Sequence, residues 1–238
     1  MNKLFKLIQL IIHGYFPILL RTKVAAGIEH TKVLAPLNCK HVVDIGGNRG
    51  QFALVARKCF PQAKIDSFEP LSEPAACFQS VFYADPNTKL HRLAIGSKEE
   101  DVEIHISSRD DSSSLLPITE TQSTLFPGTG ECSTRIIHVA PLKSVLSENE
   151  IQEPALLKID VQGFELEVLY GCEELIEKFR YLYVECSFVE LYEGQALADE
   201  VISFLHERHY ILNGVYNLCY DIQGKAVQAD FFFILHKE

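Results

Sequence analysis

The chain lacks an excess of positive charge. Its 238 residues include 22 Lys and Arg against 32 Asp and Glu, which gives a formal net charge of −10 at pH 7. Proteins that hold DNA or RNA do so largely by neutralising phosphates with Lys and Arg side chains. We therefore expect no nucleic acid among the partners of this protein.

The chain also lacks the cysteine and histidine spacings of disulfide and metal sites. Its seven cysteines contain no C-x-x-C pair, and their odd number leaves at least one of them unpaired. Reduced thiols in a cytoplasmic protein are the simpler explanation, and no spacing indicates a metal site. The cysteines are Cys39, Cys59, Cys77, Cys132, Cys172, Cys186 and Cys219.

A long apolar run is missing as well, although the N-terminus approaches one. Residues 4–12 are mostly apolar, but Lys6 and His13 interrupt the pattern before it reaches the roughly 18 apolar residues of a membrane span. Arg21 lies where the cleavage region of a secretory signal would be uncharged. We expect an amphipathic helical extension, residues 1–38, that packs on the following domain or closes over its ligand site. Weak contact with the inner face of a membrane or with a partner protein is the alternative.

Strand-like and helix-like segments alternate from residue 39 to residue 238, which is typical of βα units around a mostly parallel sheet. These residues are therefore expected to form one doubly wound α/β domain, of a size that can bury a full core. Residues 107–133 are rich in Ser, Thr, Asp, Gly and Pro, and we expect a loop that acts with the N-terminal helix as a substrate lid. Helices are expected at 50–59, 73–83, 141–147, 165–171 and 197–208, and strands at 41–45, 64–69, 89–95, 102–107, 135–139, 155–160, 181–185, 210–213 and 229–235.

The most informative segment is residues 42–52, which predicts a buried strand, a glycine turn and a helix start in that order. Gly46 and Gly50 allow the backbone to turn sharply and to approach a ligand closely, and the helix that follows directs free N–H groups at that ligand. A purely structural turn would also favour glycine, so the motif alone leaves that alternative open. Asp44 places a carboxylate just before the turn, which suits a ligand with an ammonium and a sulfonium group.

An acidic residue at the end of the next predicted strand supports a nucleotide cofactor. Glu69 follows the glycine turn by about 20 residues, the position from which an acid accepts hydrogen bonds from ribose hydroxyls. The turn lacks the G-x-G-x-x-G spacing of dinucleotide sites, because the chain has Asp-x-Gly-x-Asn-x-Gly at 44–50 instead. An NAD-dependent oxidoreductase is therefore disfavoured, and S-adenosylmethionine is the expected cofactor.

Three further acids are candidate catalytic residues. Asp160 follows a predicted buried strand, Glu165 lies in the first turn of the next helix, and Glu185 ends the strand after that. Because ligands of open α/β sheets bind at the carboxyl ends of the strands, Asp160, or failing that Glu185, is placed to take a proton from an attacking hydroxyl. Each acid has a structural alternative: a helix N-cap for Asp160, interaction with the helix dipole for Glu165, and a solvated strand-end acid for Glu185.

Several motifs together resemble the FkbM family of S-adenosylmethionine-dependent methyltransferases, within the class I, Rossmann-like superfamily. The glycine turn VDIGGNRG at 43–50 is shared by the superfamily, whereas LKIDVQGFELEVL at 157–169 and the serine run at 112–115 are more specific to the family. The resemblance covers the chain from about residue 41 onward. The other matching segments are FEP at 68–70, LAIG at 93–96 and VECSF at 184–188.

The resemblance implies a seven-stranded sheet with an antiparallel C-terminal strand, and methyl transfer to a hydroxyl of a sugar, glycan or secondary metabolite. It also implies that Asp160 lies near the sulfonium and the incoming nucleophile. The chain departs from the family at Lys143, where Asp is typical, and at Gln162, where Glu is common. A Rossmann-like module that binds a cofactor or a partner without catalysis is the alternative. The residues implied to bind the cofactor are Asp44, Gly46, Gly47, Asn48 and Gly50 around its methionine part, Glu69 and Pro70 at its ribose, and Ala94 and Ile95 near its adenine.

Overall fold

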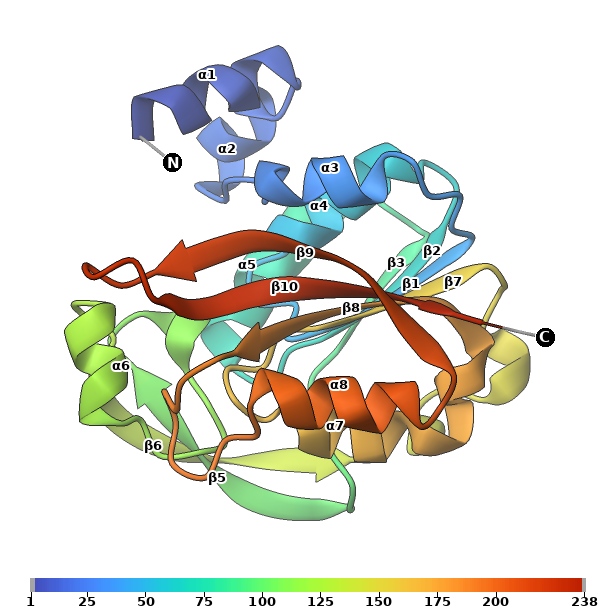
Figure 1. Cartoon of the computed structure of the whole chain (residues 1–238). Coiled ribbons are helices and arrows are strands. Elements are labelled where there is room, and N and C mark those ends of the chain that lie inside the picture. The colour runs from blue at the N-terminus through green and yellow to red at the C-terminus, as the bar shows by residue number, and fades with distance from the viewer. Residues whose placement is uncertain (1–2, 237–238) are drawn as a thin grey trace.

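The computed structural model describes residues 3–236 and shows a seven-stranded sheet with helices on both faces (Figure 1). Its strands are β1 His41–Ile45, β2 Lys64–Phe68, β3 Thr88–His91, β7 Ala155–Ile159, β8 Phe179–Ser187, β9 Tyr210–Tyr220 and β10 Ala226–Leu235. They lie in the order β3-β2-β1-β7-β8-β10-β9. The first five in this order are parallel, and β10 is antiparallel to both of its neighbours. The predicted doubly wound, mostly parallel sheet with an antiparallel C-terminal strand is confirmed.

Two apolar cores, one on each face of the sheet, hold the helices in place. Successive side chains of a strand point to opposite faces, so Val42 packs toward α4 and α5 while Val43 packs toward α7 and α8. All five residues of β1 are buried, as expected for a central strand covered on both sides. The helices of these two layers are α3 Thr31–Leu34, α4 Gln51–Cys59 and α5 Ser72–Val81 on one face, and α7 Glu165–Cys172 and α8 Ala198–His206 on the other.

A second, three-stranded sheet lies beside the first and corrects part of the predicted strand pattern. It has the order β4-β6-β5 and consists of β4 Ala94–Ile95, β5 Glu100–Ser107 and β6 Glu131–Ala140. The single strand expected at 89–95 is in fact two strands in different sheets, because β3 ends at His91 and Ala94 pairs with Val139 of β6. This change of sheet places Ala94 and Ile95 beside the carboxyl edge of the main sheet.

The segment expected to be an irregular loop, residues 107–133, has regular structure of its own. It holds the 3-10 helix η2 Asp110–Ser112 and the helix α6 Glu120–Leu125, whose N-terminus is capped by the hydroxyl of Thr119. Its apolar side chains pack with Leu191 and Tyr192 in a small separate cluster. The helix expected at 141–147 is shorter than predicted, a 3-10 turn η3 at Leu142–Ser144.

The N-terminal region divides into two parts. The helices α1 Lys3–Ile12 and α2 Phe16–Thr22 lie at the outside of the molecule (Figure 1) and contact the core through Leu10, whereas Val24 and Leu34 lie within the core cluster that includes α4. The expected boundary at residue 38 thus falls inside a continuous core cluster. Within residues 3–236, no helix is both long and apolar enough to cross a membrane.

Candidate active site

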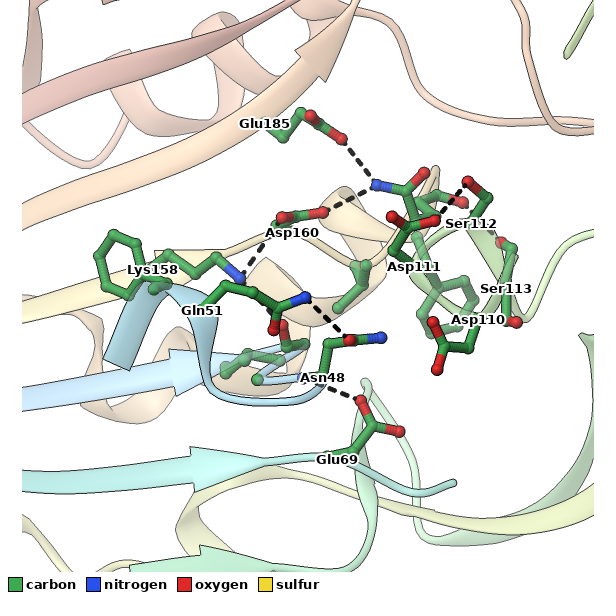
Figure 2. Close-up of a pocket in the computed structure, with 18 of the residues that line it drawn as sticks. Asn48, Gln51, Glu69, Asp110, Asp111, Ser112, Ser113, Lys158, Asp160 and Glu185 are labelled. Atoms are coloured by element: carbon green, nitrogen blue, oxygen red, sulfur yellow. Dashed lines mark hydrogen bonds and ion pairs between the residues drawn. The ribbon is translucent and has the colours of Figure 1, made fainter. Parts of the chain in front are cut away.

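A cavity of about 470 Å³ opens at the carboxyl ends of the parallel strands. Figure 2 shows Asn48 and Glu69 on one side of it and Asp160 and Glu185 on the other. The loop after β1, the end of β2, the short strand β4 and the loop after β7 all contribute to its wall. This is the edge at which ligands of open α/β sheets bind.

The glycine turn after β1 is shaped by close contact between two backbone segments. Gly46 has a φ of +79°, and a Cβ built on it would lie 1.8 Å from the carbonyl oxygen of Asp160. The N–H groups of Gly46 and Gly47 donate to the carbonyl of Phe68 at 3.1 and 2.9 Å. Gly50, with a φ of +93°, lies one turn further on as the N-cap of α4 and outside the cavity wall. It serves the helix start, whereas Gly46 and Gly47 line the cavity.

Glu69 meets the glycine turn as the sequence predicts. One of its carboxylate oxygens accepts the backbone N–H of Asn48 at 3.0 Å and the other accepts that of Leu71 at 2.7 Å. The side chain is almost wholly buried, and burial raises the pKa of Glu69 to about 7. The carboxylate is therefore fixed in position at the cavity wall, with oxygen lone pairs left for a ligand.

The predicted adenine region is an apolar section of the wall. Pro70, Ala94 and Ile95 line the cavity together with Phe164, which was not among the predicted residues. Pro70 lies in the loop after β2, Ala94 and Ile95 form β4, and Phe164 precedes α7. Together they form an apolar surface that suits a flat heterocycle.

Lys158 lies at the centre of the site and was not predicted. Its Nζ lies 3.2 Å from Asp44 Oδ1 and 3.5 Å from Asp160 Oδ2, and it donates to the carbonyl of Gly46 at 2.9 Å. Burial alone would lower the pKa of Lys158, but the charges of Asp160 and Asp44 outweigh burial and raise the pKa above its usual value. The available signal was a lysine inside the otherwise apolar strand β7.

Asp44 lies beneath the cavity and not on its wall, which differs from the expected contact with the ligand. Its carboxylate is fully buried, accepts a hydrogen bond from Ser67 Oγ at 3.1 Å, and is neutralised by Lys158. A carboxylate that already holds a buried cation has little attraction left for a ligand ammonium. Asp44 therefore fixes Lys158 under the glycine turn.

Asp160 and Glu185 are joined by the side chain of Gln162. The amide nitrogen Nε2 donates to Asp160 Oδ1 and to Glu185 Oε2, both at 2.8 Å, and the amide oxygen Oε1 accepts from the hydroxyl of Tyr192 at 2.9 Å. Gln162 reaches this position with a left-handed φ of +59°. At the position where Glu is common in the family, Gln162 thus places two N–H donors between two acids. A carboxylate there would repel both of them.

The two acids differ in their electrostatic environment. Burial, followed by the charges of Asp160 and Asp230, holds the pKa of Glu185 well above its usual value. The side chain of Asp160 is 37% exposed and lies beside the cation of Lys158. Asp160 therefore presents the more accessible carboxylate, whereas burial disfavours the charged form of Glu185.

The structure does not favour a catalytic role for Glu165. Its carboxylate is turned back onto its own helix start, where Oε1 accepts the N–H groups of Val161 and Gly163, both at 3.1 Å. Glu165 is buried and lies outside the cavity wall, and burial raises its pKa to about 7. It stabilises the turn that carries Asp160 and Gln162, which agrees with the structural alternative for this residue.

The serine run lies over the cavity and is fastened to the Gln162 turn. Ser114 Oγ donates to the carbonyl of Gln162 at 2.6 Å, and the carbonyl of Ser112 accepts from the Tyr192 hydroxyl at 3.1 Å. On the opposite side, Arg49 of the glycine turn forms an ion pair with Asp110 at 2.6 Å. Residues 109–115 therefore connect the glycine turn to the Gln162 turn.

Comparison with known proteins defines the class of this α/β chain. The family model described as the methyltransferase FkbM domain matches residues 44–212. The chain therefore belongs to the FkbM methyltransferase family. This membership identifies it as a methyl-transferring enzyme.

Two characterised relatives and one solved structure resemble the chain. It is 30% identical over 176 residues to the 2-O-methyltransferase NoeI of Sinorhizobium fredii, covering 69% of this chain and 70% of that protein. It is 26% identical over 145 residues to Methyltransferase 1 of Beauveria bassiana, covering 56% of this chain and 58% of that protein. An uncharacterized protein from Listeria monocytogenes shares the fold, with a TM-score of 0.51 and 8% identity over 88% of this chain and 68% of that one.

Proposed function

We propose that this FkbM-family enzyme transfers a methyl group from S-adenosylmethionine to a hydroxyl of a sugar, glycan or secondary metabolite. The observation that carries the proposal is the single cavity that presents Glu69 and the glycine turn on one side and the exposed carboxylate of Asp160 on the other. The 2-O-methyltransferase named among the relatives supports transfer to oxygen.

The residues of the cavity fit this cofactor in charge as well as in shape. The cavity wall includes seven carboxylic acids and two Lys or Arg residues. S-adenosylmethionine carries a sulfonium and an ammonium group against one carboxylate, so an acidic cavity attracts it. Glu69 would bind the ribose hydroxyls, and the wall of Pro70, Ala94 and Ile95 would contact the adenine. The cofactor supplies an electrophilic methyl group.

The chain itself then has to align an acceptor hydroxyl and remove its proton. Asp160 accepts the proton as the hydroxyl oxygen attacks, while Gln162 and Lys158 hold the two oxygens of its carboxylate in position. Burial raises the pKa of Glu185, which disfavours its charged form, and its two carboxylate oxygens accept hydrogen bonds from the amide groups of Gln162 and Gln228.

Calorimetric titration and product analysis test this proposal against its two rivals. We expect heat of binding with S-adenosylmethionine and S-adenosylhomocysteine but not with NAD, and a gain of one methyl group in a panel of sugar and natural-product alcohols followed by mass spectrometry. Binding of NAD alone would support an oxidoreductase. Cofactor binding without any methylated product across the panel would support a non-catalytic module.

We also propose that the cytoplasmic enzyme uses its N-terminal helices for weak contact with a membrane surface. Ile8, Ile11, Ile12 and Leu20 of α1 and α2 are between 44% and 68% exposed, and the positively charged Arg21 lies in the last turn of α2. Apolar side chains beside cations are typical of interfacial helices.

Vesicle co-sedimentation measures this contact. The variant Ile11→Ser, Ile12→Ser should sediment less than the wild type with vesicles of phosphatidylcholine and phosphatidylglycerol. Ile136→Ser is the matched control, because Ile136 is 68% exposed on β6, away from these helices. Equal sedimentation of all three proteins would reject the proposal.

A further inference from the structure

A second group of polar side chains lines the same cavity beyond Asp160 and Glu185, and the reaction described above does not use it. Its members come from the two strands β9 and β10 and from the N-terminal 3-10 helix η1 Ile28–His30. Since β8, β10 and β9 follow β7 in the sheet, the group lies on the far side of Asp160 from Glu69. The members that line the cavity are His30, Asn217, Gln228 and Asp230.

Asp230 is held through one carboxylate oxygen only. Its Oδ2 accepts the hydroxyl of Tyr183 at 2.8 Å and the amide Nδ2 of Asn217 at 2.7 Å, and lies 3.5 Å from His30 Nδ1. The other oxygen, Oδ1, accepts no hydrogen bond from any residue in the range 3–236, although Asp230 lines the cavity. One oxygen therefore fixes the side chain and the other is left for a ligand.

Gln228 and His30 share this arrangement. The amide nitrogen of Gln228 donates to Glu185 Oε1 at 2.9 Å, while its amide oxygen makes no side-chain hydrogen bond within the described chain. Edge contacts with Phe52 and Tyr183 fix the ring of His30, with ring centroids 5.3 and 5.6 Å from its own. Of the two ring nitrogens, only Nδ1 contacts Asp230 and the residues around Asp230. Asp230, Gln228 and His30 are thus each held in position, and each keeps one polar atom for a ligand.

The chemistry of these atoms selects the ligand. A carboxylate oxygen and an amide oxygen accept hydrogen bonds, so they match hydroxyl or ammonium groups. The carboxylates of Asp160 and Asp230 would repel a phosphate or carboxylate, which costs affinity for an anionic ligand. Several fixed acceptors at one end of a cavity suit a ring that carries several hydroxyls.

We propose that Asp230, Gln228 and His30 form the acceptor subsite of this enzyme, which takes a polyhydroxylated ring that is uncharged or bears an amino group and rejects phosphorylated or carboxylated sugars. This inference rests on the proposed methyl transfer. It also assigns part of the acceptor specificity to the N-terminal region, because His30 comes from residues before β1.

Binding of simple sugars to the full chain saturated with S-adenosylhomocysteine tests the subsite apart from turnover. The probes are methyl glucoside, glucosamine, glucuronic acid and glucose 6-phosphate, followed by saturation-transfer NMR and competition titration. We expect the first two to bind and the two anionic sugars not to bind. Asp230→Asn should weaken glucosamine binding at least tenfold, and Asp101→Asn, the same change at an exposed site on β5, should leave it unchanged.

Two outcomes separate this inference from the proposed function. If the protein binds S-adenosylhomocysteine but takes the anionic sugars as well as the neutral ones, takes none of the four, or is insensitive to Asp230→Asn, the subsite is wrong while the cofactor site stands. Failure to bind S-adenosylhomocysteine would count against the proposed function instead. Should Asp230→Asn not fold, as judged by its thermal melt, Gln228→Ala provides the same test with the same expected loss.

Discussion

The two ends of the cavity are built in different ways. At the end nearest β2, the glycine turn at residues 46–48 and one carboxylate, Glu69, form the wall, and all of them come from one strand-turn-helix unit and the strand after it. At the other end, side chains from η1, β8, β9 and β10 meet, with up to 200 positions between His30 and Asp230. The first end depends on backbone conformation, the second on side-chain chemistry.

This difference predicts which substitutions are tolerated at each end. A backbone site fails when the chain cannot adopt its path, whereas a side-chain site fails when a single functional group is lost. The variants below are ordered from the largest expected effect to the smallest, and they act on the glycine turn, on Glu69 or on the charged residues between the two ends.

Gly46→Ala should abolish cofactor binding. A Cβ at Gly46 would lie 1.8 Å from the carbonyl oxygen of Asp160, and forcing the two segments apart should cost about 3 kcal/mol or more. Gly224→Ala is the matched control, since Gly224 has a similar φ of +80° but no atom within 4 Å of the added carbon. That control should lose about 1–2 kcal/mol from strain alone. Calorimetry and thermal melts measure both, and equal effects in the two variants would contradict the close contact.

Asp160→Asn should lower kcat by about 10²–10⁴-fold, because it removes the proton acceptor. Binding of S-adenosylhomocysteine should change little. Glu185→Gln should have a smaller effect on kcat, because burial raises the pKa of Glu185 and disfavours the charged form that a base requires. A larger loss for Glu185→Gln than for Asp160→Asn would reverse the assignment of the base, and a fully active Asp160→Asn enzyme would remove Asp160 from it.

Lys158→Met should destabilise the fold by about 3–5 kcal/mol, because it leaves the buried carboxylate of Asp44 without its cation. Urea unfolding measures the change. The double variant Lys158→Met, Asp44→Asn should recover most of the loss, since neither charge remains. If the single variant is as stable as the wild type, the ion pair does not hold the base of the glycine turn.

The pH dependence of cofactor binding should report on Glu69 and is the smallest of these effects. Its pKa is raised to about 7, so the ionised carboxylate that ribose hydroxyls prefer forms only as the pH rises. Affinity should increase by up to about tenfold between pH 6 and pH 8, and Glu69→Gln should remove this dependence. A flat profile for the wild type would show that the ionisation of Glu69 does not limit binding.

The raised pKa of Glu69 has the opposite effect on the stability of the ligand-free protein, because the contribution of Glu69 to stability falls as the pH rises. The unfolded chain releases the proton of Glu69 near the ordinary value of 4.5, but the folded chain retains it up to about 7. The contribution of Glu69 to stability is therefore fully present below pH 4.5 and is lost as the pH rises toward 7. Urea midpoints at pH 4.5 and pH 7, compared between the wild type and Glu69→Gln, check this sign.

The sequence predicts the first end well because its signals are local. Gly46, Asn48 and Glu69 are brought together by one turn and one neighbouring strand, and their hydrogen bonds follow from that arrangement. The sheet is equally predictable from alternation and apolar strands. Sequence reasoning failed at the division of 89–95 into β3 and β4, because two short strands joined by two residues have the same pattern as one.

The centre and the second end depend on contacts that no local pattern describes. The role of Lys158 depends on Asp44 and Asp160, which lie around it. The role of Gln162 depends on its left-handed backbone, which directs the amide between two acids. Asp230 meets Asn217 on the neighbouring strand of its own hairpin, but Tyr183 and His30 come from distant parts of the chain. Packing decides these contacts, so they had to be seen in three dimensions.

A crystal structure of the chain with S-adenosylhomocysteine tests the central claim most directly. We predict the ribose hydroxyls on Glu69, the adenine against Ala94 and Ile95, and the sulfur directed toward Asp160, with the space beside Asp230 left open for an acceptor. A ligand bound with its ribose away from Glu69, or occupying the space beside Asp230, would contradict the division of the cavity into a cofactor end and an acceptor end.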